Sequence, residues 1–189
     1  MDGAIARGRY TSVDGSFNVR LPHATSSFEG QNLQVRDGKS SGDRGKATYV
    51  IFGPGPTDPA GYHVILATAR RDGPPAASLA ERAARINEYY MRQYNSTFGG
   101  VAERLVFERT DAAGRPAIYS IYRYEYGERD DPEEFFVAFK VIQADDGRVV
   151  NVMAEKLTTA NPWYPGIDTL VGGTWDRFND FAASVEVID

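Results

Sequence analysis

The sequence predicts an α+β fold: a mainly antiparallel, curved sheet with helices packed on its faces, built by residues 1–189 as a single domain. Two observations support this prediction. Most neighbouring strand-like segments are joined by turns of hairpin length, which favours antiparallel pairs. Only two segments, 78–98 and 167–184, carry the apolar spacing of an amphipathic helix, and each must cover an apolar face of the sheet.

The N-terminal region predicts a hairpin followed by three more strands. Residues 8–13 and 16–21 flank the turn dipeptide Asp14-Gly15, and their alternation places Phe17, Val19 and Leu21 on one face. Further strands are expected at 32–36, 46–52 and 62–69, with a polar loop over 37–45 and a Gly-Pro-Gly-Pro turn at 53–56. The near-continuous apolar run at 62–69 predicts a central position in the sheet.

Both helical segments carry start and stop signals. Ser78 and Glu81 have the spacing of a capping box, and Gly99-Gly100 ends the first helix, whose buried stripe is expected to be Leu79, Ala83, Ile86, Tyr90 and Tyr94. The second segment is expected to break at Gly172-Gly173, with Thr174 capping its second part. The side chains expected to bury it are Leu170, Val171, Phe178, Phe181 and Val185.

Between the helices, residues 103–110 predict a strand, and residues 115–157 predict three more that form the centre of the sheet. In the second of these three, Phe135, Val137, Phe139 and Val141 make an unbroken apolar face. On the third, after the Asp-Asp-Gly turn at 145–147, the inner face is expected to continue with Val150, Val152 and Ala154.

Composition excludes several classes of function. A formal net charge of -5 and a pI near 5.1 argue against a nucleic-acid partner, which usually needs a basic surface. The chain has no cysteine, so it has no disulfides, thiol catalysis or cysteine metal ligands. No apolar run approaches the roughly 18 residues that span a bilayer, and the N-terminus lacks the apolar core of a signal peptide.

No motif indicates catalysis, a cofactor or a metal. Two histidines, His23 and His63, are too few for a recognisable metal site, and no Gly-x-Ser-x-Gly elbow is present. The acidic cluster Glu125, Glu128, Asp130, Asp131, Glu133 and Glu134 lacks the spacing of a calcium loop and is interpreted as a solvated loop, which in a functional role would dock a basic partner patch. We therefore expect a non-enzymatic protein.

Tyrosines supply the one candidate binding surface. The residues are Tyr89, Tyr90, Tyr122, Tyr124, Tyr126 and Arg123, which are predicted to lie where the first helix meets the sheet. Aromatic side chains beside arginine can line a groove for a ligand or a partner. The alternative is that the rings pack beneath the helix, with their hydroxyl groups reaching water.

The ordered pattern resembles the PsbP-like superfamily. The matching segments are Asp-Gly-Ser-Phe-Asn-Val-Arg-Leu-Pro at 14–22, Gly-Arg-Pro-Ala-Ile-Tyr-Ser-Ile-Tyr at 114–122, Asp-Gly-Arg-Val-Val-Asn-Val-Met-Ala at 146–154, and the closing helix from Trp175. This helix runs into Ser-Val-Glu-Val at 184–187, where the family typically has Ser-Phe-x-Val. The resemblance implies an α/β/α sandwich but assigns no functional residue.

The resemblance also implies a function: a non-catalytic binding or accessory module of the bacterial cell envelope, with an unknown protein as its partner. Many superfamily members are bacterial lipoproteins, so the implied location is periplasmic or anchored by a lipid outside this sequence, while a cytosolic location stays open. Two alternatives remain. One is a small-ligand carrier with an aromatic cleft between helix and sheet. The other is an enzyme with a scattered site that uses His63.

Overall fold

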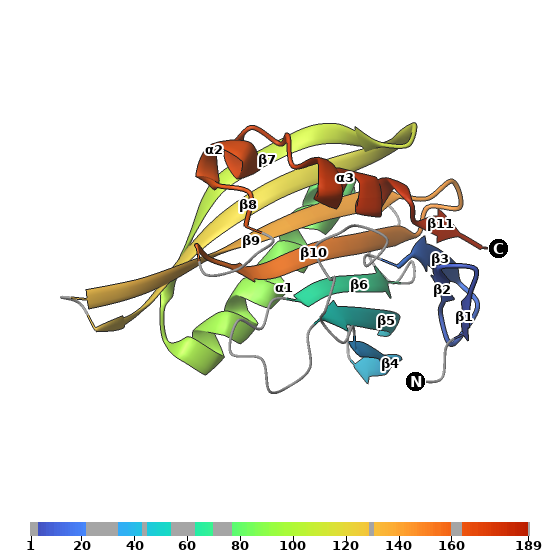
Figure 1. Cartoon of the computed structure of the whole chain (residues 1–189), viewed down its shortest axis with the longest axis horizontal. Helices are drawn as coiled ribbons and strands as arrows, with labels where there is room; N and C mark the ends of the chain where they lie inside the picture. Colours follow the sequence, from blue (N-terminus) through green and yellow to red (C-terminus); the bar gives the residue numbers. More distant parts are fainter. Residues whose placement is uncertain are drawn as a thin grey trace.

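In the computed structural model, the chain folds as a seven-stranded antiparallel sheet between two helical layers (Figure 1). The structure describes residues 4–21, 34–42, 45–53, 63–69, 77–128, 131–159 and 164–188. In spatial order, the sheet consists of β4 (Gln34–Gly42), β5 (Gly45–Gly53), β6 (His63–Ala69), β10 (Val149–Leu157), β9 (Asp131–Gln143), β8 (Arg115–Glu128) and β7 (Val101–Ala112).

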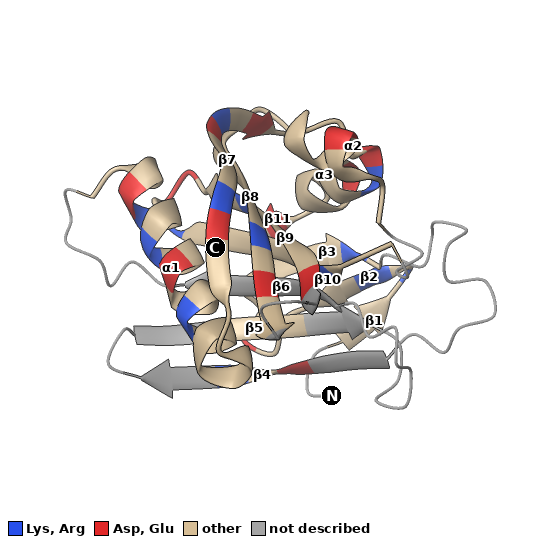
Figure 2. Cartoon of the chain, turned by 90° about the vertical axis from the view of Figure 1, so that its left-hand side faces the viewer, with Lys and Arg blue, Asp and Glu red and all other residues tan. Residues whose placement is uncertain are grey.

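Helix α1 (Leu79–Phe98) covers one face of this sheet (Figure 2). The predicted capping box is present, since Glu81 N–H donates to Ser78 Oγ and Ser78 N–H donates to Glu81. The helix ends at Gly99, whose φ of 69° suits glycine. Its buried stripe holds Ala83, Asn87, Met91 and Tyr94; Leu79, Ile86 and Tyr90 are half-buried beside it.

The opposite face is covered by α2 (Ile167–Val171), α3 (Asp176–Ala183) and a small second sheet. The small sheet has the order β1 (Ala4–Ala6), β2 (Arg9–Thr11), β3 (Phe17–Arg20) and β11 (Glu186–Val187). Phe17, Val19 and Leu21 are buried as predicted, in one core with Trp175 and Phe178. The main sheet thus has an apolar core on each side, which explains why its central strands are apolar in both alternating positions.

Hydrogen bonds tie the small sheet to the main one. Asp14, in the turn between β2 and β3, accepts hydrogen bonds from Ser12, from Ser16 and from Thr48 on β5. Tyr10 donates to Asp37 on β4 at 2.9 Å. Burial alone raises the pKa of Asp14, but these hydrogen bonds outweigh it and hold the pKa well below its ordinary value.

Several predictions about local structure are wrong. Residues 37–42, expected in a loop, belong to β4, which pairs with β5 as far as Gly42 and Gly45. Val150, Val152 and Ala154 lie opposite Ile142, Lys140 and Ala138, so they share the face of α3 and not the face of Phe135 and Val137. Because both faces are buried, the apolar pattern alone does not decide between these registers.

The C-terminal segment breaks at Gly172 and Gly173 as predicted, but two details differ. Trp175, not Thr174, is the N-cap of α3, and its side chain makes no capping hydrogen bond. Val171 is exposed, whereas Leu170, Phe178, Phe181 and Val185 are buried as expected. None of the helices among the described residues combines the length and the apolar composition that a bilayer crossing requires.

Candidate functional site

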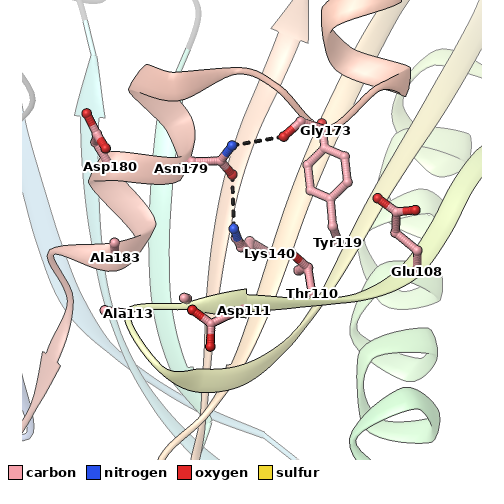
Figure 3. A pocket seen from close by; sticks show the side chains of 11 residues that line it. Glu108, Thr110, Asp111, Ala113, Tyr119, Lys140, Gly173, Asn179, Asp180 and Ala183 are labelled. Atoms are coloured by element: carbon pink, nitrogen blue, oxygen red, sulfur yellow. Dashed lines mark hydrogen bonds between the residues drawn. The ribbon is translucent and has the colours of Figure 1, made fainter.

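A cavity of about 320 Å³ lies between the main sheet and α3 (Figure 3). Strand β7 contributes Glu108, Thr110 and Asp111; β8 contributes Tyr119, β9 contributes Lys140, and the C-terminal segment contributes Gly173, Asn179 and Asp180. These residues meet because three adjacent strands present one face to α3, whose buried side chains Phe178 and Phe181 hold it on the sheet.

Lys140 is the residue that gives this cavity its chemistry. Only 4% of the residue is exposed, and its Nζ donates a hydrogen bond of 2.9 Å to Asn179 Oδ1. Asn179 Nδ2 in turn donates to the carbonyl of Gly173 at 2.9 Å, so one amide links the lysine to the turn before α3. Burial lowers the pKa of Lys140, and the Asp111 carboxylate partly opposes that shift.

Tyr119 supports the cavity wall. Its ring is buried against Phe178, and its hydroxyl donates a hydrogen bond of 2.7 Å to the carbonyl of Leu170. Burial, with a smaller contribution from the Glu108 charge, raises the pKa of Tyr119 far above its ordinary value. The tyrosine is therefore a neutral hydrogen-bond donor that holds α2 on the sheet.

Three of the lining residues are carboxylates, and they lie on different sides of the cavity. In Figure 3 Glu108 lies beside Tyr119, Asp180 points away from Lys140, and Asp111 lies below strand β7. Glu108, Asp111 and Asp180 are all exposed, and each lines the cavity. Asp111 accepts a hydrogen bond from the Gly114 N–H at 2.8 Å, which fixes its position in the β7–β8 turn. The site thus combines a buried ammonium group with three exposed carboxylates.

None of the residues in this cavity was predicted from the sequence to be part of a site. In Phe-Phe-Val-Ala-Phe-Lys-Val-Ile-Gln, Lys140 resembles the usual outward-facing polar residue of a half-buried strand. The available signal was that both neighbouring strands are apolar on both faces, so a lysine there has no solvent-exposed face to occupy.

The predicted tyrosine surface is distributed over several environments. Tyr122 and Tyr124 are buried under α1, where they contact Phe139 and Phe135. The Tyr124 hydroxyl donates to Asn95 Oδ1 at 3.0 Å and accepts from the Gly100 N–H at 2.9 Å. These two tyrosines are therefore part of the core.

The other predicted tyrosines lie at the margins of this core beneath α1. Tyr89 is 44% exposed, while Tyr90 and Tyr126 are half-buried. Arg123 alternates with the tyrosines along β8, so it lies on the opposite face, where it pairs with Glu103 and Glu125. The six residues do not converge on one surface, and the idea that they line a groove stays a prediction.

Buried polar groups also lie beneath α1. Tyr94 donates to the buried Glu155, and Asn87 Nδ2 donates to Ser120 Oγ at 2.6 Å. Burial is the main cause that raises the pKa of Tyr90 to about 12, and the pKa of Tyr94 is raised further by burial and by Glu155. His63 pairs with Glu155 across β6 and β10, but the structure describes only the backbone of this histidine.

The acidic segment, expected as a loop, extends the β8–β9 hairpin. Glu125 pairs with Glu134, and Glu128 pairs with Asp131, so most of the segment is strand. Within the described ranges, no group of three or more potential ligands could hold a metal ion. Asp130 and His23 lie outside these ranges.

Comparison with solved structures identifies the fold. The solution structure of cyanobacterial PsbP (CyanoP) from Synechocystis sp. PCC 6803 aligns over 98% of this chain and 96% of its own, with a TM-score of 0.57. The chain has the PsbP-like fold. At 16% sequence identity the likeness extends to the fold alone. No family model and no curated protein matches the sequence.

Proposed function

We propose that the protein is a non-catalytic accessory module that binds a protein partner in the bacterial cell envelope, either in the periplasm or anchored by a lipid outside this sequence. The PsbP-like fold supports an accessory role, because the family resemblance implies one. The observation that carries the proposal is an acidic and apolar surface at one end of the molecule.

This hairpin-end surface takes in both sides of the end of the sheet. Val101, Glu103, Glu125 and Glu134 lie on the α3 side, whereas Phe98 and Glu133 lie on the α1 side. The surface lies where α1 ends, β7 begins and the β8–β9 hairpin projects from the sheet (Figure 1), and Figure 2 views the molecule from this end. Val101 is 71% exposed and lies opposite Glu125 across the β7–β8 pair, and Phe98 is 36% exposed. Single exposed apolar residues are ordinary, but here each has carboxylates on its own side of the sheet: Val101 has Glu103, Glu125 and Glu134, and Phe98 has Glu133.

The charges of the surface indicate which kind of partner would complement it. Arg123 neutralises part of the charge by pairing with Glu103 and Glu125, which leaves Glu133 and Glu134 without an ion pair to a described cation. A partner with basic side chains around an apolar one would complement this surface, and the association should weaken as salt rises.

Strand addition to the β7 edge of the sheet is a less suitable mode of binding. Edge strand β7 carries exposed charges at Glu103, Arg104, Glu108 and Arg109, and its register shifts between Arg104 and Val106. Charged side chains and bulges are the features by which edge strands avoid pairing with other chains. The partner is therefore expected to dock through side chains and not through the backbone of β7.

Charge reversal tests the proposal. Glu133→Lys with Glu134→Lys changes the hairpin end, and Glu88→Lys with Asp145→Lys makes the same net change at exposed positions elsewhere. In affinity capture from the native envelope fraction, the wild type and the control should retain a common protein at low salt that the hairpin variant loses. Equal retention by both variants would reject the hairpin surface. A failure to retain anything, together with turnover of a substrate, would reject the binding role.

The ligand-carrier alternative receives little support from the aromatic region. The rings of Tyr94, Tyr124 and Phe135 lie within 5.8 Å of one another, centre to centre, and all three are buried. This is a packed core beneath α1, whereas the cavity described above lies on the other face of the sheet.

A further inference from the structure

The cavity beneath α3 is independent of the hairpin-end surface and has a chemistry of its own. We propose that it binds a small zwitterion, whose carboxylate contacts the Lys140 ammonium and whose cationic group faces the Glu108 carboxylate, which lies beside Tyr119 and Gly173. A free amino acid is the simplest molecule of this class. Three features support this proposal: the size of the cavity, the lack of an ion pair between Lys140 and the described residues, and the position of the charged side chains around it.

The cavity is large enough for such a molecule. Its volume of about 320 Å³ lies at the lower end of the range of small-molecule pockets. Its wall comes from rigid elements, since β7, β8 and β9 are continuously paired beside it and Asn179 ties α3 to Gly173. A ligand would therefore find positioned groups, which reduces the cost of ordering them on binding.

The Lys140 ammonium has more hydrogen-bond donors than the described residues accept. An ammonium group has three N–H donors, and among the described residues Asn179 is its only hydrogen-bond partner. No carboxylate of the described chain lies within 4 Å of its nitrogen. A buried cation without an ion pair is costly, and a ligand carboxylate would supply both the missing acceptors and the missing charge.

The Glu108 carboxylate, beside Gly173 and Tyr119, selects the rest of the ligand. Glu108 forms no ion pair with a described cation. It would repel a simple anion approaching Lys140, and Lys140 would repel a simple cation. A molecule with both charges satisfies the two parts of the site at once, so a zwitterion fits better than either ion.

Calorimetric titration with ω-amino acids tests this inference. Glycine, β-alanine, 4-aminobutyrate and 6-aminohexanoate vary the separation of the charges, while butyrate and butylamine carry one charge each. We expect saturable binding of at least one amino acid at millimolar concentrations, about tenfold tighter than butyrate or butylamine. Lack of saturation by every amino acid, or equal binding of butyrate, would overturn the proposal.

Variants locate the binding. Lys140→Met should lower the affinity for the amino acid about tenfold or more. Lys39→Met, which removes the same charge at an exposed position, should leave this affinity unchanged. Glu108→Gln should abolish the preference for the zwitterion over butyrate. In amide NMR spectra the ligand should shift Gly173 and Asn179 but not Tyr90. Binding that persists in Lys140→Met would contradict the assignment.

Discussion

Replacing Lys140 by methionine should stabilise the protein. Burial of an ammonium group carries an effective penalty of several kcal/mol, which we discount to about 3 kcal/mol because the residue borders an open cavity. The variant also loses the charged hydrogen bond to Asn179, a loss of about 1.5 kcal/mol. The net gain is then about 1.5 kcal/mol, or a Tm higher by roughly 3–6 °C for a domain of this size.

The pH dependence of the Tm difference shows whether the buried charge of Lys140, and not the packing of its side chain, causes the effect. Because the folded protein lowers the pKa of Lys140, the unfolded chain holds the proton more tightly. The burial penalty is therefore fully present at neutral pH and is relieved as pH rises toward the ordinary lysine value. We expect the difference in Tm between the variant and the wild type to shrink between pH 7 and about pH 10 in scanning calorimetry. A variant that melts below the wild type at pH 7 would refute this reasoning.

Three further predictions concern the framework of the fold. Gly100→Ala should destabilise by about 2 kcal/mol or more, because a Cβ there would lie 2.0 Å from the Glu125 carbonyl oxygen, whereas Gly99→Ala, with open space around it, should cost only about 1 kcal/mol; urea unfolding compares the two. Tyr94→Phe removes a donor from the buried Glu155 and should cost about 2 kcal/mol in the same assay, and an unchanged midpoint would show that this hydrogen bond is dispensable. The folded state lowers the pKa of Asp14, so its stabilisation is present above pH 4 and is lost as pH falls; Asp14→Asn should be less stable at pH 7 by about 1 kcal/mol, and the difference in stability between the two proteins should shrink progressively as pH falls below 4.

Local signals in the sequence correctly predicted the elements that are bounded by characteristic capping and turn residues. The capping box at Ser78 and Glu81, the Asp14-Gly15 turn and the break at Gly172-Gly173 are all present. Each depends on a few neighbouring residues, so no long-range contact is needed to predict it. The PsbP-like fold was implied by the resemblance of four segments, at 14–22, 114–122, 146–154 and from Trp175, to that superfamily, and the structural comparison confirms it.

The predictions that failed concern features that depend on long-range contacts. Val152 is apolar whichever face it occupies, and only its pairing with Lys140 across the β9–β10 hairpin shows that it lies on the α3 side. The cavity was missed for a related reason, since Lys140, Asp111 and Asn179 are distant in the sequence and are united only by strand order and by the docking of α3. Neither the spacing nor the type of these residues indicates that they meet.

The central claim is that the protein is a binding module whose partner docks at the hairpin end. Site-specific photo-crosslinking tests it most directly, with a photoreactive residue at Glu134 or, as the control, at exposed Asp176 on α3. In the native envelope the reagent at Glu134 should capture one discrete protein, with a yield that falls as salt rises, and the reagent at Asp176 should not. Equal capture at both positions, or capture at Asp176 alone, would contradict the account.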